Sequence, residues 1–155
     1  MKTISVRDCM SKLVLTIGSQ ASLKEAHDLM REKRVRRLPV VDQDALVGIV
    51  TLLDVSEARP PGADTLRPTA LVVSISLMKV ADVMTRNPIT VAPDATILDI
   101  ARLMARHKIG GIPVVEQGQV VGIVSESDAF RTLVQAIDEE ERHKAVSTTQ
   151  GTKTV

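Results

Sequence analysis

The sequence contains the same unit twice, at a fixed offset. When the chain is shifted by 74 positions, Val6–Ala58 aligns with Val80–Thr132 without a gap, and 16 of the 53 aligned residues are identical. The identities are dense where Leu38–Val41 aligns with Ile112–Val115 and where Val47–Val50 aligns with Val121–Val124. Repeated units of this kind bury a shared core by packing against each other. We therefore expect a pseudo-twofold pair with matched clefts between the two copies.

Each copy contains the signals of a strand, a helix, two further strands and a second helix. In the second copy the β-branched run Ile89–Val91 predicts a strand, and apolar residues from Ile97 to Met104 recur at the spacing of one helix face. Thr96 and Asp99 have the spacing of a capping box. The other strands and helices that we expect are strands near Leu13–Ile17, at Leu38–Val41, Ala45–Val50, Ile112–Val115 and Gln119–Val124, and a helix at Leu23–Lys33.

A helix that connects two neighbouring strands makes them parallel, whereas a hairpin is antiparallel. We therefore predict an α/β (α+β) fold in which each β-α-β-β-α repeat is a small mixed sheet with helices on one face. The two repeats then pack as a pseudo-twofold pair. The expected boundaries are residues 1–58 for repeat 1, 59–79 for the linker, 80–136 for repeat 2, and 137–155 for the end of the last helix and a flexible tail.

The linker and the C-terminal segment have separate signals. Arg59–Gly62 contains two prolines and a glycine and predicts a loop. Thr69–Lys79 has features of both strand and helix, and we expect a connecting helix. From Ser127 to about Lys144 we predict a longer helix, and the polar residues 148–155 are expected to be disordered. One stripe of that helix is apolar and comprises Phe130, Leu133, Val134 and Ile137.

Composition argues against several classes of function. Phe130 is the one aromatic residue, and the net charge is +1, so both the stacking platforms and the basic field of a nucleic-acid binder are lacking. A single cysteine, Cys9, predicts a reducing compartment and a small buried side chain without a disulfide. No apolar run is long enough to span a bilayer, and Met1–Thr3 leads directly into repeat 1. We expect a cytoplasmic protein.

One motif follows the last strand of each copy. A glycine and two apolar residues precede a hydroxyl residue, and an aspartate follows three positions later: Thr51 with Asp54, and Ser125 with Asp128. This spacing is that of a helix cap. An ionised aspartate also suits the two hydroxyls of a ribose, and a helix N-terminus suits a phosphate. Both interpretations remain open at this point.

A basic run precedes the second strand of repeat 1. Five of the seven residues in Arg31–Arg37 are basic, whereas repeat 2 has Gly110 and Gly111 where repeat 1 has Arg36 and Arg37. A charge run at a helix end is commonly a solvated face. Arg36 and Arg37, however, lie at the mouth of a strand, where guanidinium groups could pair with phosphate oxygens.

Catalytic and metal-binding constellations are missing from the sequence. His27, His107 and His143 are scattered, and no acidic pair has metal-ligand spacing. His27 falls on the apolar stripe of its helix and is predicted to be packed. We expect no catalytic residue, no metal and no enzymatic activity.

These motifs together resemble the CBS domain, named after cystathionine β-synthase, which occurs in tandem pairs. The resemblance rests on Val80–Met84, the strand containing Thr90, the Pro-Val-Val strand and the glycine-to-aspartate motif, and it extends from Val6 to about Ala136. It implies two clefts between the repeats that bind adenosyl ligands such as AMP, ADP, ATP or S-adenosylmethionine. It also implies regulation of a partner protein rather than catalysis.

Carried over position by position, the resemblance implies two ligand sites, each shared between the repeats. Site B comprises Thr16, Ile17, Ala21, Val35, Arg36, Arg37, Ser125 and Asp128. Site A comprises Thr51, Asp54, Ile89, Thr90, Val91, Ala95, Ile109 and Gly110. Because site A has glycines in place of the two arginines, site B is expected to be the better site for a phosphorylated nucleotide.

The sequence thus predicts a stand-alone regulatory module that senses an adenine nucleotide or another adenosyl compound and acts through a partner protein or its own assembly state. The resemblance further implies a homodimer formed through the helices that follow the motifs. The alternative is a ligand-free dimerisation or scaffold module in which the aspartates only cap helices. Binding to nucleic acid through Arg31–Arg37 is a third and weaker hypothesis.

Overall fold

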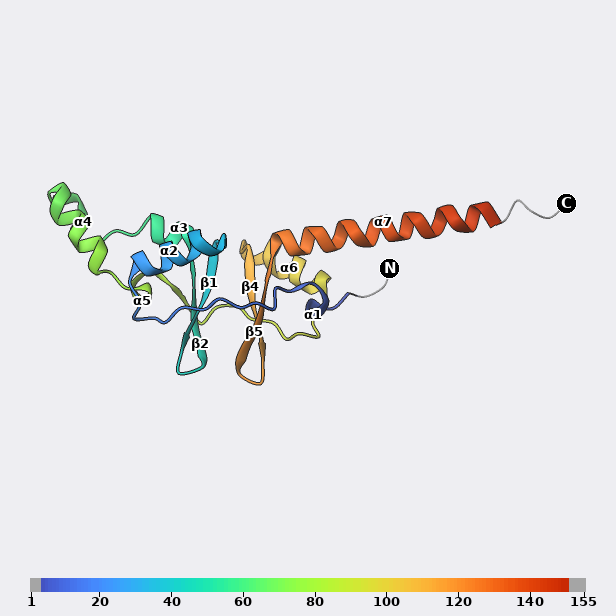
Figure 1. Ribbon diagram of the computed structural model, residues 1–155, viewed down its shortest axis with the longest axis horizontal. Coiled ribbons are helices and arrows are strands. Elements are labelled where there is room, and N and C mark those ends of the chain that lie inside the picture. The colour runs from blue at the N-terminus through green and yellow to red at the C-terminus, as the bar shows by residue number, and fades with distance from the viewer. Residues whose placement is uncertain (1–3, 151–155) are drawn as a thin grey trace.

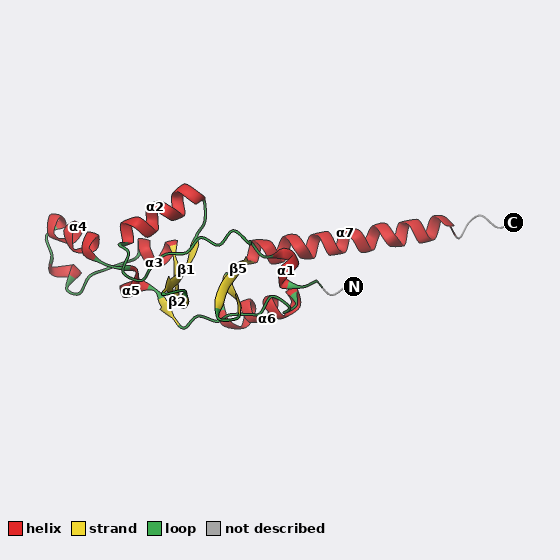
Figure 2. Cartoon of the chain, turned by 60° about the horizontal axis from the view of Figure 1, so that its bottom comes forward, coloured by secondary structure: helices red, strands yellow, loops and turns green. Residues whose placement is uncertain are grey.

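The computed structural model describes residues 4–150 of the chain, with side-chain surroundings given for residues 4–146. Two β-hairpins lie side by side at the centre of an elongated molecule, α4 lies at one end, and α7 projects from the other (Figure 1). Figure 2 shows helices packed beside each hairpin. The elements are α1 (Val6–Cys9), α2 (Leu23–Lys33), β1 (Arg37–Asp42), β2 (Ala45–Thr51), α3 (Leu52–Ser56), a short 3₁₀ turn (Ala63–Thr65), α4 (Pro68–Leu77), α5 (Val80–Val83), β3 (Thr85–Arg86), α6 (Ile97–His107), β4 (Gly111–Glu116), β5 (Gln119–Ser125) and α7 (Glu126–Gln150).

The two hairpins have the same design. β1 pairs with β2 and β4 pairs with β5, both antiparallel, and each ladder has an irregularity at the same repeat position, after Val40 and after Val114. The turn residues have positive φ: Gln43 and Asp44 in one hairpin, Gln117 and Gly118 in the other. Two positive-φ residues match the right-handed twist of the flanking strands, which explains the tight turns.

The expected first strand of each repeat is reduced to a single parallel bridge. Ile17 pairs with Val40, and Val91 pairs with Val114. The direction of pairing agrees with the prediction, but the predicted strands near Leu13–Ile17 and at Ile89–Val91 are wrong in extent. The cause is a proline in the partner strand, Pro39 or Pro113. To extend the parallel pairing by one more step, the partner strand would have to donate a hydrogen bond from the backbone N–H of this residue, and proline has no N–H.

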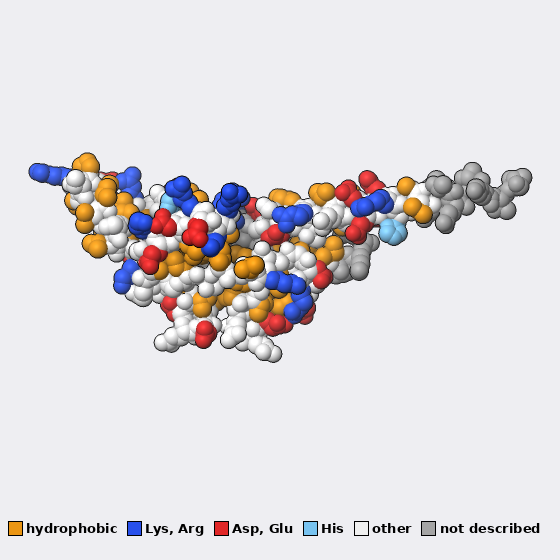
Figure 3. Space-filling model, in the orientation of Figure 1, with side chains coloured by type: hydrophobic (Ala, Val, Ile, Leu, Met, Phe, Trp, Pro, Cys, Tyr) orange, Lys and Arg blue, Asp and Glu red, His pale blue; other side chains and the backbone are white. Residues whose placement is uncertain are grey.

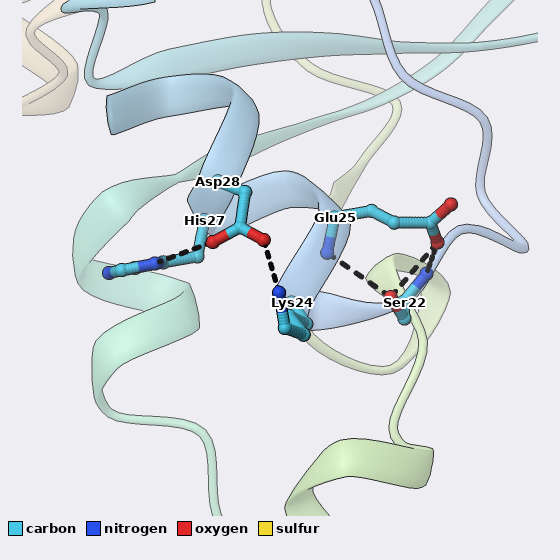
Figure 4. Close-up of polar contacts among 5 residues, drawn as sticks. All are labelled: Ser22, Lys24, Glu25, His27 and Asp28. Atoms are coloured by element: carbon cyan, nitrogen blue, oxygen red, sulfur yellow. Dashed lines mark hydrogen bonds and ion pairs between the residues drawn. The ribbon is translucent and has the colours of Figure 1, made fainter. Parts of the chain in front are cut away.

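The helix N-termini follow the sequence closely. At the start of α2 the Ser22 hydroxyl accepts a hydrogen bond from the Glu25 N–H at 3.1 Å, and the Glu25 carboxylate accepts one from the Ser22 N–H at 2.7 Å (Figure 4). Thr96 and Asp99 form the equivalent box at α6, as predicted. One turn into α2, the His27 ring lies 3.7 Å from Asp28 and its side chain is 39% exposed, so it is less packed than expected.

Each hairpin core is completed by a segment from the other repeat. Val80 of α5 and the following Met84 are buried with Leu38 in the core beneath the first hairpin. Val6 of α1 is buried with Ile112 in the core beneath the second hairpin. The chain therefore crosses the seam at the start of each repeat, and neither core is built from one repeat alone.

Two short pairings mark these crossings. β3 continues from α5 and pairs with β2, where Thr85 lies opposite Ile49. Ser11 follows α1 and forms the equivalent bridge with Ile123 of β5. Gly48 lies beside the first crossing, and a Cβ there would be 2.9 Å from the Thr85 carbonyl oxygen. The close backbone approach between the repeats therefore requires glycine.

The linker and the C-terminal helix are exposed. The predicted connecting helix is confirmed as α4, on which Val72, Val73 and Leu77 face solvent. α7 continues to Gln150, so the prediction of disorder is wrong for residues 148–150, whereas residues 151–155 lie outside the described part of the chain. No helix between residues 4 and 150 combines the length and apolar character that crossing a bilayer requires.

Candidate functional site between the two repeats

Two clefts open along the seam where the repeats meet. Cleft A has a volume of about 660 Å³ and cleft B a volume of about 250 Å³. Cleft A lies between the β2–α3 corner of repeat 1 and two segments of repeat 2, at 85–89 and 108–111. Cleft B lies between the β5–α7 corner of repeat 2 and the segment 34–37 of repeat 1.

The two clefts are related by the repeat. Residues that occupy equivalent repeat positions line equivalent walls: Thr51 and Ser125, Ile49 and Ile123, Ile109 and Val35, Lys108 and Arg34, and Thr85 and Ser11. Each cleft thus combines the motif of one repeat with the crossing segment and the second-strand entrance of the other. The pseudo-twofold arrangement that the repeat implied places both motif corners at the seam.

The aspartates of the motif cap their own helices. The Asp128 carboxylate accepts hydrogen bonds from the Ser125 N–H at 2.9 Å and the Ser125 hydroxyl at 2.6 Å. The Asp54 carboxylate does the same for Thr51, at 2.7 Å for both. In each case Oδ2 makes both bonds. A carboxylate has about four acceptor positions across its two oxygens, so capping leaves capacity for a ligand hydroxyl.

The two aspartates differ in their access to the clefts. Asp128 lines cleft B, and its Oδ1 accepts a hydrogen bond from Arg131 at 3.2 Å. Asp54 is half-buried but does not line cleft A, where Thr51, Ser56 and Thr85 supply the hydroxyl groups. The sequence motif therefore places its hydroxyl in both clefts and its carboxylate in one.

Arg36 and Arg37 line both clefts, as does Gly110. The expectation that site A would lack arginines beside its glycines does not hold, because the arginines of repeat 1 extend to the seam. Burial lowers the pKa of the Arg37 guanidinium, and the nearby charge of Glu126 opposes that shift. Arginine remains charged throughout the accessible pH range. Figure 3 shows basic side chains over α2 and over the region where β1 and β4 begin.

The electrostatics of the two clefts are unlike. The charged residues that line cleft A are Arg36, Arg37 and Lys108, all cations. Cleft B has four arginines but also the carboxylates of Glu126 and Asp128. Glu126 occupies the repeat position of Leu52, which lines cleft A. Cleft A is therefore the larger, and its lining carries no acidic side chain.

Some of the predicted site residues line the cleft to which they were assigned, and the others do not. Val35, Arg36, Arg37, Ser125 and Asp128 of site B line cleft B, and Thr51, Ile89, Ile109 and Gly110 of site A line cleft A. The remainder lie outside the cleft linings. Of these, Ile17, Ala21, Val91 and Ala95 pack against the hairpin cores; the others are Thr16, Thr90 and Asp54.

Several lining residues were missed in the sequence. Ser11, Arg34, Ile123, Glu126, Ser127 and Arg131 line cleft B, and Ile49, Leu52, Leu53, Ser56, Thr85, Asn87, Pro88 and Lys108 line cleft A. The fixed offset between the repeats could have predicted many of these residues. Ser11 and Thr85, for example, occupy equivalent positions in the two repeats. The two serines of the β5–α7 corner belong to the motif itself.

Other chemistry is sparse in the described part of the chain. Among residues 4–146 no cluster of three His, Cys, Asp or Glu side chains is suited to hold a metal. Cys9 is partly buried, its thiol lies 3.4 Å from the Val6 carbonyl oxygen, and burial raises its pKa. A thiol with a raised pKa is less reactive, in keeping with the predicted packing role.

A family model for the CBS domain matches the chain twice, at residues 6–60 and 80–135. The chain belongs to the CBS domain family. The tandem CBS pair that the sequence predicted is thereby confirmed, together with its mixed α and β fold.

Solved CBS structures resemble this chain along most of its length. The CBS domain pair of protein MJ0100, in complex with 5′-methylthioadenosine and S-adenosyl-L-methionine, is 31% identical with a TM-score of 0.72, covering 87% of this chain and 99% of that chain. CBSX2, in complex with AMP, is 29% identical with a TM-score of 0.70, covering 85% of this chain and 97% of that chain. CBSX2 is a CBS-pair protein from Arabidopsis thaliana.

Longer proteins are also similar to this chain over part of their length. An inosine-5′-monophosphate dehydrogenase of Korarchaeum cryptofilum is 40% identical over 118 residues, which are 76% of this chain. The matched segment spans 22% of that protein.

Proposed function

We propose that this CBS pair is a regulatory module that binds an adenosyl ligand of the AMP, ADP and ATP class in the clefts between its repeats. Occupancy is proposed to act through a partner protein or through the assembly state of the module. The observation that carries the proposal is the pair of equivalent clefts that meet at Arg36 and Arg37.

Cleft A has the features that such a ligand needs. Its volume of about 660 Å³ lies within the usual range of small-molecule sites, roughly 300–1,000 Å³. Ile49, Ile89 and Ile109 offer an apolar surface for a base, and Thr51 offers a hydroxyl at the start of α3. Arg36 and Arg37 suit phosphate oxygens, which guanidinium groups bind in a bidentate manner.

Cleft B offers similar chemistry in less space. Ser125 and Asp128 provide acceptors for ribose hydroxyls, and Arg34, Arg36 and Arg37 provide the cations. Thr16, Ile17 and Ala21 remain proposed contacts of a base in site B, as do Asp54, Thr90, Val91 and Ala95 in site A. The relatives with adenosyl ligands support this class of ligand without identifying the compound.

A thermal-shift series with AMP, ADP, ATP, S-adenosylmethionine and NAD tests the proposal. A ligand at 100 times its dissociation constant adds about 2.7 kcal/mol to the free energy of unfolding. For a chain of this size that corresponds to a rise in Tm of about 5–11 °C. Calorimetry then gives affinity and stoichiometry for each compound that shifts the Tm. If none of the five compounds changes the Tm or gives a binding isotherm, the proposal is wrong.

The second candidate is a scaffold that binds no ligand. It is favoured by one observation: Asp54 and Asp128 are already engaged as helix caps within their own repeats. The exposed apolar stripe on α7 would then be the functional surface. Mass spectrometry of small molecules that copurify with the protein separates the two candidates, since a scaffold would release no adenosyl compound.

Homodimerisation is proposed in either case. Phe130, Leu133, Val134 and Ile137 lie at successive helix-face spacings on α7, and each is at least 45% exposed. Exposed apolar side chains arranged along one helix face commonly mark an interaction surface. Action on a partner protein, location in the cytoplasm and lack of catalysis remain predictions.

A further inference from the structure

The seam between the clefts is asymmetric at one pair of repeat positions. Arg36 and Arg37 in repeat 1 correspond to Gly110 and Gly111 in repeat 2. A Cβ at Gly110 would lie 2.1 Å from Nη2 of Arg37, and a Cβ at Gly111 would lie 2.7 Å from Cδ of Arg37. Both distances are far inside van der Waals contact. The glycines of repeat 2 therefore make the room that the Arg37 side chain of repeat 1 occupies.

The cations at the seam lack protein partners. Among residues 4–146, the side chains of Arg36, Arg37 and Lys108 form neither a hydrogen bond nor an ion pair within 4.0 Å. Arg37 is nonetheless partly removed from water. A charge that is desolvated and unpaired is unfavourable, and an anion that reaches it recovers that free energy.

Glu126 is the acidic group that faces Arg37. The Glu126 carboxylate lies 3.1 Å from the Cβ position of Gly110, over which the guanidinium also extends, but the two side chains do not form a salt bridge. Glu126 lines cleft B and not cleft A. The Glu126 carboxylate is therefore close to the seam but does not neutralise the Arg37 guanidinium.

We propose that Arg36 and Arg37 form a single polyphosphate subsite that is shared by the two clefts. The ligand chemistry is a diphosphate or triphosphate group, either free or as part of a nucleotide. Because the same two arginines line both clefts, a phosphate chain bound from one cleft takes the cations that a ligand in the other cleft would need. Two phosphate chains at one subsite would also repel each other.

The consequence is a difference between charged and uncharged ligands. An uncharged nucleoside that uses only the apolar and hydroxyl walls can occupy the two clefts independently. A nucleoside triphosphate binds tightly once per chain, and a second molecule binds about 10- to 100-fold more weakly, the usual effect of losing one charge-assisted hydrogen bond. The nucleoside part of this inference rests on the proposed function, whereas the polyphosphate subsite does not.

Calorimetric titrations with tripolyphosphate, ATP and adenosine test the inference on the full chain. We expect one tripolyphosphate per chain, competition between tripolyphosphate and ATP, and no competition between tripolyphosphate and adenosine. Two tripolyphosphate ions bound per chain with equal affinity, or none bound, would overturn the shared subsite. If tripolyphosphate binds but neither adenosine nor ATP binds, the polyphosphate subsite stands and the adenosyl proposal is refuted.

Two variants and a control assign the effect to Arg37. In Arg37→Gln we expect the affinity for tripolyphosphate to fall about 10- to 100-fold, and the two ATP affinities to converge. Gly110→Ala keeps every charge but places a methyl group where the Arg37 guanidinium lies, so it should also lower the affinity for tripolyphosphate. Lys33→Gln removes a nearby cation that pairs with Glu32 and lines neither cleft, and it should change nothing. Wild-type affinity in both Arg37→Gln and Gly110→Ala would overturn the assignment.

Discussion

At the scale of single residues, one pattern of a hydroxyl residue and an aspartate recurs at the start of three helices. Asp54, Asp99 and Asp128 all accept hydrogen bonds from a hydroxyl residue three positions earlier, so each caps a helix. Asp128 is the one of the three that also lines a cleft. The capping interpretation and the ligand interpretation of the motif are therefore compatible, because each uses a different part of the carboxylate.

Asp99 provides a matched control for the role of Asp128. We expect both Asp128→Ala and Asp99→Ala to lower the free energy of unfolding by similar amounts, because each removes the N3 carboxylate of a capping box. Asp128→Ala should in addition lower the affinity for the proposed nucleotide by about 10- to 100-fold, in line with losing one charged hydrogen bond. Urea unfolding and calorimetry measure the two effects. Equal nucleotide affinity in the two variants would remove Asp128 from the site.

The caps also predict an acid dependence of stability. Hydrogen bonds from Thr96 hold the pKa of Asp99 below its usual range, and those from Ser22 and Ser19 do the same for Glu25 and Asp42. The unfolded chain then binds more protons than the folded chain as the pH falls. The stabilisation is complete above the ordinary carboxyl pKa values of about 4. It is lost as the pH falls through the lower folded-state values.

Unfolding by urea at pH 7, 4 and 3 measures this dependence. We expect a smaller loss of stability on acidification in Asp99→Asn than in the wild-type protein, because that variant no longer has the depressed carboxyl. Glu141→Gln, in the exposed distal part of α7, is the control. A pH profile in Asp99→Asn that superimposes on the wild-type profile would contradict the cap as its origin.

At the scale of elements, the crossings between repeats hold the molecule together. α1 and α5 each complete the core of the other repeat, and the segments that follow them, Ser11 and β3, pair across the seam. The motif corners and the crossing segments are neighbours in space for this reason. A change that separates a crossing from its hairpin should weaken both the core and the adjacent cleft.

Gly48→Ala tests the crossing at β3. The added methyl group would lie 2.9 Å from the Thr85 carbonyl oxygen and 2.7 Å from the Met84 sulfur, and the backbone oxygen cannot move aside without shifting β3. We expect a loss of about 1–3 kcal/mol, the usual effect of overpacking. Gly18→Ala is the control, because its nearest contact would be an ordinary 3.8 Å. Similar unfolding midpoints for the two variants would contradict the prediction, because they would show that β3 can move away from β2 without a loss of stability.

At the scale of the whole molecule, exposed apolar side chains in the described part of the chain gather on two helices. One group is the stripe on the first part of α7, and the other is on α4, at one end of the molecule, where Val72, Val73 and Leu77 are exposed (Figure 1). The α7 stripe is continuous along one helix face and begins beside cleft B. It is therefore the surface through which dimerisation and cleft occupancy could be linked.

Leu133→Asp tests the proposed dimer. A carboxylate placed in an apolar helix interface is left without a partner, so the variant should be monomeric where the wild-type protein is dimeric. Sedimentation equilibrium measures the mass of each. Val72→Asp places the same charge on the exposed face of α4 and should leave the mass unchanged. A wild-type protein that sediments as a monomer would refute the dimer outright.

The sequence by itself determined the repeat, the longer helices, the strands of the two hairpins and the family. Apolar spacing predicted α2, α6 and α7, and the hydroxyl-to-aspartate motif predicted the caps, because helix periodicity and capping depend on residues only a few positions apart. The central prolines of β1 and β4 were visible as well, yet their effect on the neighbouring strand depends on register, which a local pattern does not contain.

Only the tertiary structure decided how the two clefts divide their residues. The sequence assigned Arg36 and Arg37 to one site and the glycines to the other, whereas the fold brings all four positions together at one seam. It also decided that Val6 and Val80 belong to the core of the opposite repeat. The physical reason is the same in both cases: a long side chain and a crossing backbone act across the pseudo-twofold axis, between residues that are far apart in the sequence.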